Sequence, residues 1–481
     1  MNVRDLLPSA VWGHFADLNA VPRPSKHEQR VTGFMKHFGE SLGLETQVDG
    51  LGNVIIKKPG TAGKESGPVV ILQSHLDMVH QKNEGTVFNF STEGIQMYVD
   101  GDWVRAKGTT LGADNGMGVA ATMALLSSKD VPHPPLVALF TTDEESGMTG
   151  AIGLEKGLIE GDIMLNMDTE EDDELCFGCA GGLDTVSTMS CKMESIKPGF
   201  VGFRLGVSGL NGGHSGMDIH KGLGNANRIL IRLMYYVSSL YEGRVAKFKG
   251  GSVRNAIPRE GSAVVAVQKK FQKECRTGLE NLIDDIKTEL AITEPNLIIW
   301  VEDAVTPHYV LDRKIQLRVL NALYAIPNGV FRMNTSIEGL VDTSNNLAVM
   351  ELREGVFTTQ NLSRSSIDSS KLDVANQVRA ALESAGATVE NDNEYPGWTP
   401  NPNSPILQLM KEIYTDLFGA TPNASSIHAG LECGILSEKI SDVDIISFGP
   451  TIKGAHSPDE RVCVSSVQKF WLYLTTVLAK L

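Results

Sequence analysis

Short hydrophobic runs alternate with helical patterns along the first third of the chain. The helical patterns cover residues 10–19, 28–42 and 115–127, and the hydrophobic runs cover residues 54–56, 69–72, 136–140 and 163–165. The runs are rich in Val, Ile and Leu and are bounded by Gly, Pro or Asp, which is typical of buried strands in a mostly parallel sheet. This alternation predicts an α/β layer architecture.

The pattern changes after Gly181-Gly182. Strand-like segments cover residues 201–207, 263–268, 297–301 and 347–352, and amphipathic helical segments cover residues 224–240, 279–290 and 370–384. Their alternation predicts an α+β domain of the ferredoxin-like kind. A Pro- and Asn-rich stretch then ends in Ser404-Pro405, which predicts the start of a helix that stops at Gly419. A buried strand over 443–448 and a helix over 465–478 return to the first pattern.

We therefore expect one α/β domain with a mixed, mostly parallel sheet, interrupted by an inserted domain. The α/β domain takes residues 1–181 and 398–481, and the inserted α+β domain takes residues 182–397. The insertion has 216 residues, which is roughly twice what a single ferredoxin-like unit needs.

Composition narrows the choice of partners and compartment. The 58 Asp and Glu residues outnumber the 43 Lys and Arg residues, and this net charge of −15 argues against binding to nucleic acid or to anionic membranes. We expect no membrane span and no secretory signal, because long apolar runs are missing. Six cysteines are too few for a disulfide framework, so a reduced cytoplasm is expected. The single C-x-x-C at Cys176 and Cys179 lacks a second pair and is interpreted as incidental.

Acidic and histidine residues follow the predicted strands. These candidates are His75 and Asp77, Asp114 at the start of a helix, the run Asp143-Glu144-Glu145, Asp168, and His456. In open α/β sheets, ligand sites lie beyond the carboxyl ends of the strands. Five such segments suffice for two metal ions that share a carboxylate, and imidazole with carboxylate ligands suits zinc, with manganese or cobalt as alternatives.

Each of these residues also has a simpler structural interpretation. His75 alone could be a hydrogen-bonded structural histidine, and Asp114 beside glycines could be a helix N-cap. The acidic run at 143–145 and the acidic stretch after Asp168 could be solvated loops. These separate interpretations do not explain the pattern as a whole. Unrelated caps and loops would not be expected to place a His, Asp or Glu after each of several successive strands.

Taken together, these blocks resemble the co-catalytic di-zinc peptidases, a family that includes aminoacylases, carboxypeptidase G, carnosinases and bacterial dipeptidases. The matching blocks are Ser74-His75-Leu76-Asp77, Gly112-Ala113-Asp114-Asn115-Gly116, Asp143-Glu144-Glu145, Asn166-Met167-Asp168 and Ala455-His456-Ser457. The order and spacing of these blocks, and the position of the inserted domain, resemble the family's pattern over essentially the whole chain. Within the family, Leu51-Gly52-Asn53, the segment 75–79 and His428-Ala429-Gly430-Leu431-Glu432 are similar to the bacterial aminoacyl-histidine, or cytosolic non-specific, dipeptidases.

The resemblance implies a role for each catalytic-domain residue. His75 and Asp168 would hold one zinc ion, Glu145 and His456 the other, and Asp114 would bridge the two. Cobalt or manganese could replace zinc. Glu144 would be the general base that takes a proton from the attacking water. Asp77 would accept the second ring N–H of His75 and fix its tautomer.

The resemblance also implies that the inserted domain is a lid. His214, on the Gly-rich segment 208–216, would donate to the developing oxyanion. Asn255 and Arg364 would bind the substrate's backbone and terminal carboxylate, because a guanidinium meets a carboxylate bidentately. A structural salt bridge is the alternative for Arg364. Gly430 would allow close approach of the substrate, and an ordinary turn glycine is its alternative.

The implied activity is that of a metal-dependent dipeptidase. It would hydrolyse Xaa-His and other unblocked dipeptides, including β-alanyl-histidine, with a water held by two metals. Two alternatives remain open: an N-acyl-amino-acid amidohydrolase or tripeptidase of the same family, and a non-catalytic metal-binding assembly protein. The family pattern implies a homodimer that forms through the lid. Whether the long insertion supplies His214 in cis or to the partner subunit stays open.

Overall fold

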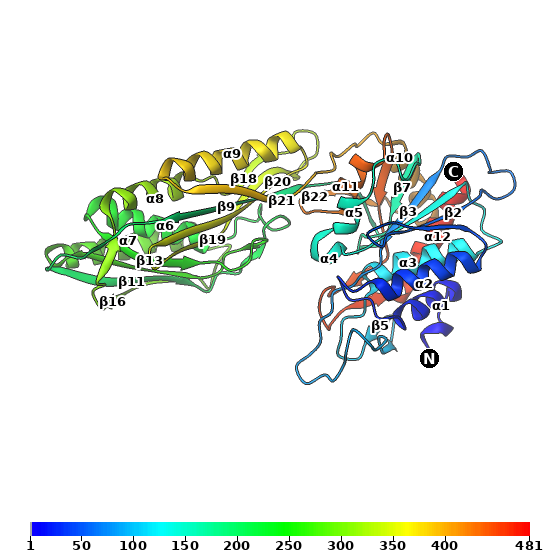
Figure 1. The fold of residues 1–481 in the computed structure, drawn as a ribbon, viewed down its shortest axis with the longest axis horizontal. Coiled ribbons are helices and arrows are strands. Elements are labelled where there is room, and N and C mark those ends of the chain that lie inside the picture. The colour runs from blue at the N-terminus through cyan, green and yellow to red at the C-terminus, as the bar shows by residue number, and fades with distance from the viewer. Residues whose placement is uncertain (1) are drawn as a thin grey trace. The chain divides into compact units, whose positions relative to one another are not determined.

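The computed structural model describes residues 2–481, which fold into two compact units (Figure 1). The first unit contains the residues through Gly178 together with Pro400–Ser426 and Leu431–Leu481. The second unit contains Cys179–Thr399 and Ile427–Gly430. Among the described residues, no helix is long and apolar enough to cross a membrane.

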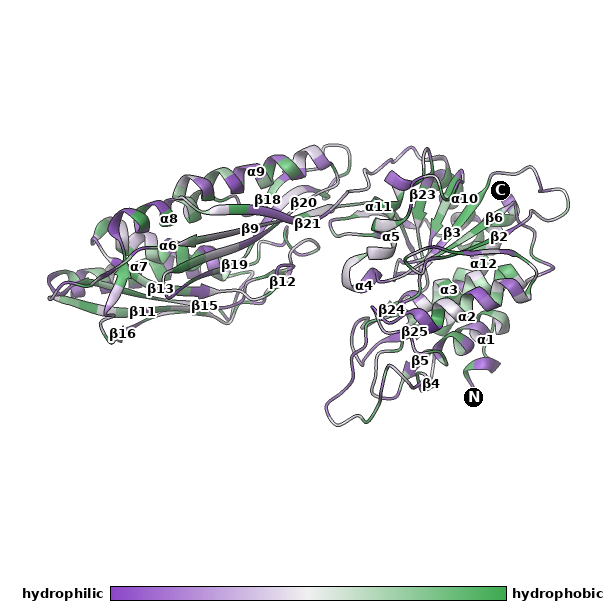
Figure 2. Cartoon of the chain, viewed as in Figure 1, coloured by the Kyte–Doolittle hydropathy of each residue, from purple (hydrophilic) through white to green (hydrophobic). Residues whose placement is uncertain are grey.

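An eight-stranded mixed sheet forms the centre of the first unit. Across the sheet the strands are β1 (Glu45–Val48), β2 (Val54–Lys58), β6 (Leu136–Thr141), β3 (Val70–His75), β7 (Ile163–Asn166), β23 (Asp444–Ser447), β8 (Glu174–Cys179) and β22 (Asn423–Ile427). The four central strands β6, β3, β7 and β23 run parallel, whereas β2 and β8 pair antiparallel with their neighbours. Strands β3 and β6 are buried at every position and are largely hydrophobic in Figure 2. The predicted α/β fold with a mostly parallel sheet is confirmed.

Helices cover this sheet and bury its hydrophobic residues. Helix α3 (Ala113–Ser127) packs against β3 and α1 (Ser9–Asn19), and α2 (Gln29–Ser41) joins them through Met35, which lies in one cluster with Phe140. Elsewhere α10 (Pro405–Phe418) packs against β23 and α12 (Val464–Lys480). The predicted start of α10 is confirmed, because Ser404 Oγ accepts a hydrogen bond from the Leu407 N–H at 3.1 Å. Its predicted stop at Gly419 is also confirmed, with φ of +68°.

Smaller elements complete the first unit, and α4 (Glu144–Gly147) among them carries Glu144 and Glu145. These elements are the 3-10 helix η1 (Val3–Asp5), the helices α4, α5 (Thr149–Gly153) and α11 (Glu432–Lys439), and a sheet of β24 (Ile452–Lys453), β25 (Arg461–Cys463), β5 (Trp103–Ala106) and β4 (Met97–Asp100). The sequence pattern did not predict this four-stranded sheet, because its strands span only two to four residues. The turn between β24 and β25 contains His456.

The second unit is built on a nine-stranded antiparallel sheet. Its strands are β9 (Gly181–Ser190), β11 (Phe200–Ser208), β13 (Arg244–Gly250), β15 (Gly261–Gln268), β16 (Ile298–Ala304), β18 (Gly329–Met333), β19 (Val341–Arg353), β20 (Val356–Ser365) and β21 (Thr388–Tyr395). Its helices are α6 (Ala226–Leu240), η2 (Lys269–Phe271), α7 (Gln272–Glu289), α8 (Arg313–Ala325) and α9 (Asp368–Ala385). One hydrophobic cluster joins the sheet to the four α-helices.

Two copies of a βαββαβ arrangement account for the size of this sheet. In the first half, β11, α6, β13, β15, α7 and β16 follow one another, and their strands lie in the order β16-β11-β15-β13. In the second half, β9, α8, β19, β20, α9 and β21 give the equivalent order read in reverse, β19-β20-β9-β21. Both are the ferredoxin-like order. The halves join where β13 pairs antiparallel with β19, so that Phe248 lies opposite Leu352.

Two short strand pairs complete the second unit. One joins β10 (Met193–Ser195) to β17 (Tyr309–Leu311), and the other joins β12 (Gly213–His214) to β14 (Ala256–Ile257). The second pair brings the Gly-rich segment with His214 beside the long β13–β15 connection.

Candidate functional site

The five predicted metal ligands converge at one edge of the large sheet. His75 is the last residue of β3, Glu145 follows β6, and Asp168 follows β7. Because β3, β6 and β7 run parallel, their carboxyl ends meet at the same edge. Asp114 in the first turn of α3 and His456 in the β24–β25 turn complete the group.

Asp114 lies between two histidines and offers one oxygen to each. Its Oδ1 is 3.1 Å from His75 Nε2, and its Oδ2 is 3.2 Å from His456 Nε2. On one side, His75 Nε2 also lies 3.4 Å from Asp168 Oδ1. On the other side, His456 Nε2 lies 3.0 Å from Glu145 Oε2. The structure thus brings the five residues into two groups that share Asp114, and their role as ligands stays a prediction.

Asp77 connects His75 to the segment that carries the two glutamates. Its fully buried Oδ1 lies 3.4 Å from His75 Nδ1 and accepts the Glu144 N–H at 3.0 Å. Its Oδ2 accepts the Glu145 N–H at 3.2 Å and the Ser25 hydroxyl at 2.8 Å. Asp77 therefore orients both the imidazole ring and the start of α4.

The field of these carboxylates strongly favours positive charge. Hydrogen bonds to Asp114 and Glu145 raise the pKa of His456 to about 11. Burial alone would lower the pKa of His75, but Asp168, Asp114 and Asp77 outweigh it and raise that pKa well above its usual value. Burial raises the pKa of Glu144, and nearby carboxylates raise it further. Without a cation, protons take up the charge that these carboxylates concentrate.

The residues fit a divalent metal ion. Single ligand atoms from His75, Asp114 and Glu145 lie within 4.8 Å of one another. Glu145 Oε1 is buried and has no hydrogen-bond partner among the described residues, so an acceptor remains available there. Imidazole nitrogen and carboxylate oxygen are the donors that zinc, manganese and cobalt accept.

The N-cap interpretation of Asp114 is wrong. Asp114 and Asn115 have non-helical φ and ψ angles, so the regular turns of α3 begin after them, and the Asp114 oxygens form their hydrogen bonds with His75 and His456. The carboxylate of Glu460 supplies the acceptor instead and binds the backbone N–H groups of residues 111–114. Asp114 therefore keeps both of its oxygens for the histidines.

Sequence reasoning missed three buried charged residues around this centre. They are Glu460, Arg23 and Glu432, each at most 2% exposed. Glu432 Oε2 accepts hydrogen bonds from Gln73 Nε2 at 2.7 Å and from Thr141 Oγ1 at 2.6 Å. Glu432 ends the segment 428–432 that carried part of the family resemblance, so a signal existed for it. Arg23 stands alone between two prolines in sequence, where nothing indicates its contacts.

In the second unit, His214 is held as a neutral hydrogen-bond donor. Its Nδ1 accepts the backbone N–H groups of Gly216 at 3.2 Å and Met217 at 3.0 Å. The ring proton of a neutral imidazole must then sit on Nε2. Burial, followed by the charge of Arg364, lowers the pKa of His214 to about 4, so the ring is neutral at pH 7.

Arg364 is a buried cation that no acidic side chain of the described residues pairs with. It is 3% exposed and donates to the Tyr395 hydroxyl at 2.8 Å and to Ser215 Oγ at 3.4 Å. Within residues 2–481 it forms no ion pair, so the alternative of a structural salt bridge for Arg364 is wrong. A buried guanidinium in this state is suited to a ligand's carboxylate.

Gly430 and Asn255 lie beside this cluster in different ways. A Cβ atom at Gly430 would come within 2.8 Å of the Tyr395 ring, so glycine lets the chain pass close to the residue that Arg364 contacts. Sequence reasoning missed Tyr395, because its role depends on these two contacts. Asn255 is exposed, and its carbonyl accepts the Ser215 N–H at 2.8 Å.

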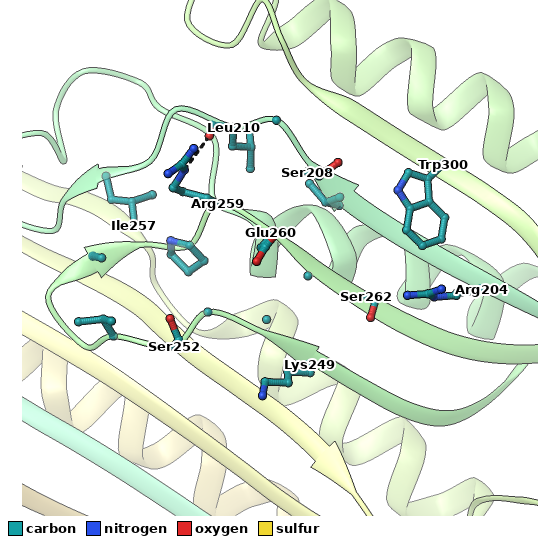
Figure 3. A pocket seen from close by; sticks show the side chains of 18 residues that line it. Arg204, Ser208, Leu210, Lys249, Ser252, Ile257, Arg259, Glu260, Ser262 and Trp300 are labelled. Atoms are coloured by element: carbon teal, nitrogen blue, oxygen red, sulfur yellow. Dashed lines mark hydrogen bonds between the residues drawn. The ribbon is translucent and has the colours of Figure 1, made fainter. Parts of the chain in front are cut away.

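One hollow of the second unit is lined by other residues. It has a volume of about 760 Å³ and is lined by Arg204, Lys249, Arg259, Glu260 and Trp300 among others (Figure 3). Its lining includes none of the predicted catalytic, metal-binding or substrate-binding residues.

Comparison with known proteins identifies relatives along the whole chain. The model of the peptidase family M20/M25/M40 matches residues 71–480. The cytosol non-specific dipeptidase of Escherichia coli K12 is 41% identical over 476 residues, which cover 99% of this chain and 98% of that protein. The crystal structure of aminoacylhistidine dipeptidase from Vibrio alginolyticus is 42% identical, with a TM-score of 0.94 over 100% of this chain and 98% of that one. A tripeptidase from Staphylococcus aureus, 16% identical over 99% of this chain and 98% of that one, shares the fold with a TM-score of 0.57.

We predict that the stability of the second unit depends on pH through His428. This histidine is buried, its Nε2 lies 2.7 Å from Ser344 Oγ, and burial followed by Arg364 lowers its pKa to about 3. An unfolded histidine binds its proton below about pH 6.5. Between pH 6.5 and 3 the unfolded state therefore holds more protons, and stability falls as the pH falls.

Differential scanning calorimetry between pH 7 and pH 4 measures this effect. The His428→Gln variant should lose less thermal stability over this range than the wild type does. His308→Gln, which changes an exposed histidine of the same unit, should follow the wild type. Equal pH dependence in all three proteins would contradict the prediction.

Proposed function

The chain belongs to the peptidase family M20/M25/M40, and on that premise we propose that it is a metal-dependent dipeptidase. Its substrates are unblocked dipeptides, above all Xaa-His dipeptides such as β-alanyl-histidine. The names of the relatives from E. coli and V. alginolyticus support this proposal, since both match at more than 40% identity over nearly the whole chain.

The observation that carries the proposal is the position of Asp114 between two histidines. Its oxygens lie 3.1 and 3.2 Å from the Nε2 atoms of His75 and His456. We propose that His75 and Asp168 hold one zinc ion, that Glu145 and His456 hold the other, and that Asp114 bridges them. Cobalt or manganese can replace zinc. When bound, the two ions lower the pKa of a water and polarise the substrate carbonyl.

Glu144 acts as the general base in this proposal. Its carboxylate accepts a proton from the attacking water and delivers it to the leaving amine. Asp77 supports this task, because it binds the backbone N–H groups of Glu144 and Glu145 through separate oxygens. The same carboxylate fixes the ring of His75.

The second unit recognises the substrate as a lid. His214 Nε2–H donates to the oxyanion of the tetrahedral species, which its tautomer supports. Arg364 binds the terminal carboxylate, and this role is supported by its burial without an ion pair among residues 2–481. Asn255 and Gly430 contact the substrate's backbone. Binding of the free amine at one end of the substrate and of the terminal carboxylate at the other excludes longer peptides. The enzyme therefore acts as a dipeptidase.

We also propose that the protein is cytoplasmic and forms a homodimer through the second unit. The word "cytosol" in the name of the E. coli relative supports the compartment. The outer strands β16 and β21 leave the two edges of the sheet available for a second copy.

Substrate and metal tests decide between this function and its alternatives. Purified enzyme with zinc should release amine from carnosine, and more slowly or not at all from Leu-Gly-Gly and acetyl-methionine. Dialysis against a chelator should abolish the activity, and zinc should restore it. Preferred cleavage of acetyl-methionine or Leu-Gly-Gly would indicate the amidohydrolase or tripeptidase. The absence of any hydrolysis by zinc-loaded protein would indicate the non-catalytic alternative.

We predict that His214→Ala acts on turnover. An oxyanion donor works in the transition state, so kcat should fall by about 10²–10³ while KM and metal content change little. Steady-state kinetics on carnosine measure both constants. His220→Ala, which removes an exposed histidine from the same loop, should retain the wild-type kcat. An effect of His214→Ala on KM alone would make His214 a ground-state contact instead.

A mixing experiment assigns His214 to its own or its partner's active site. Inactive His214→Ala protein is mixed with inactive Glu144→Ala protein under conditions that exchange subunits. If His214 serves the partner's site, a mixed dimer contains one intact site and activity returns. The family pattern, in which the lid histidine serves the neighbouring subunit, favours action in trans, so we expect activity to return. If His214 serves its own chain, each site in the mixed dimer still lacks one residue, and no recovery despite demonstrated exchange would contradict action in trans.

We predict that Arg364 and the substrate carboxylate depend on each other. Arg364→Ala should lower kcat/KM for a dipeptide by an amount equivalent to about 2–5 kcal/mol, as for other buried charge pairs. For a dipeptide whose carboxylate is replaced by an amide, kcat/KM should already be low with the wild type. The Arg364→Ala change should lower that value little further. Arg353→Ala, on the neighbouring strand β19 and exposed, is the matched control. Additive losses would contradict direct contact with the carboxylate.

A further inference from the structure

The segment 111–114, which leads into the regular turns of helix α3, is held from a distant part of the chain. Buried backbone N–H groups need an acceptor, and here they have one outside their own segment. Glu460 Oε2 accepts the N–H groups of Leu111 at 2.6 Å and Gly112 at 2.9 Å, and its Oε1 accepts those of Ala113 at 2.7 Å and Asp114 at 3.4 Å. One buried carboxylate thus holds four successive backbone amides that end at the bridging residue.

Arg23 holds the same segment from its carbonyl side. Its Nη2 donates to the Gly112 carbonyl at 2.5 Å, and its Nη1 donates to the carbonyls of Leu76 at 3.0 Å and Asp77 at 3.1 Å. The guanidinium therefore ties the segment before Asp114 to the residues that follow His75. Burial lowers the pKa of Arg23 to about 10, so it keeps its charge at pH 7.

Two glycines of the 112–116 block make room for this guanidinium. A Cβ atom on Gly112 would lie 2.6 Å from Arg23 Nη2, and one on Gly116 would lie at the same distance. Gly112 also has a φ of +69°, which side chains disfavour. The two glycines of the block Gly-Ala-Asp-Asn-Gly are therefore explained by the space that Arg23 needs, beside the role of Asp114.

Glu460 also belongs to the turn that carries His456. This turn connects β24 to β25, and within it the Glu460 N–H donates to the Ser457 carbonyl at 3.0 Å. Glu460 thus links the His456 turn to the Asp114 segment, as Arg23 links that segment to the His75 strand. These two links therefore join the Asp114 segment to the segments that carry both of its histidine neighbours.

We propose that Glu460 and Arg23 are positioning residues that hold Asp114 with one carboxylate oxygen toward each of the two histidines, His75 and His456, of the proposed metal centre. The proposal deepens the two-metal function above and rests on it. Neither side chain acts on the metals directly, because each one binds backbone groups of the segments that carry the ligands. Loss of either support lets Asp114 turn away from one histidine, so metal affinity falls while the fold persists.

Glu460→Gln tests the proposal with little change in size. A carboxamide has one acceptor oxygen, and its NH₂ group faces two backbone N–H donors. We expect metal affinity to fall by about 10–100-fold, as for other groups that orient metal ligands. Zinc titration calorimetry of the apo protein measures this affinity, and the visible spectrum of the cobalt-loaded protein should change with the ligand geometry.

Asp459→Asn is the matched control, because it removes the same charge from the neighbouring, exposed position of the same turn. It should keep the wild-type zinc affinity and cobalt spectrum. If Glu460→Gln does not fold, Arg23→Lys carries the test, since one ammonium cannot reach all three carbonyls. Wild-type affinity and spectrum in the folded variant would overturn this inference. A wild-type protein that binds no zinc would overturn the proposed function instead.

Discussion

The carboxylate of Asp114 faces two histidines, while a second acidic residue, Glu460, accepts the backbone N–H groups around it. An aspartate at the start of a helix ordinarily turns its side chain back to the free N–H groups of the first turn. Here the backbone of Asp114 and Asn115 is non-helical, and Glu460 accepts the N–H groups of residues 111–114, which precede the regular turns. The candidate metal centre thus depends on a division of roles between two acidic residues that lie 346 positions apart in sequence.

The residues that sequence reasoning could place are those whose position follows from the backbone alone. His75 and Asp168 follow parallel strands, and the carboxyl ends of such strands meet at one edge whatever the side chains do. The start of α10 at Ser404 is equally local, because an N-cap contacts residues three positions away. The family resemblance then supplied the roles, including that of Asp77.

The residues that sequence reasoning could not place act through contacts between distant segments. Arg23 touches carbonyls 53 to 89 positions away, and nothing in its own neighbourhood indicates them. Tyr395 matters only because it lies between Arg364 and Gly430. The four-stranded sheet β24-β25-β5-β4 was not predicted for a different reason. Strands of two to four residues are too short to show an alternation of hydrophobic and polar positions. The length of the insertion indicated two ferredoxin-like units. The pairing of β13 with β19, however, depends on contacts between distant segments and has no local signal in the sequence.

That pairing has a consequence for how the second unit can change in evolution. The two halves have the same topology, yet their contributions differ: His214 comes from the first half, and Arg364 comes from the second. Ser215, next to His214, already contacts Arg364 across the junction. A change that removes either half therefore also removes one partner of this contact, although the remaining half keeps the same topology.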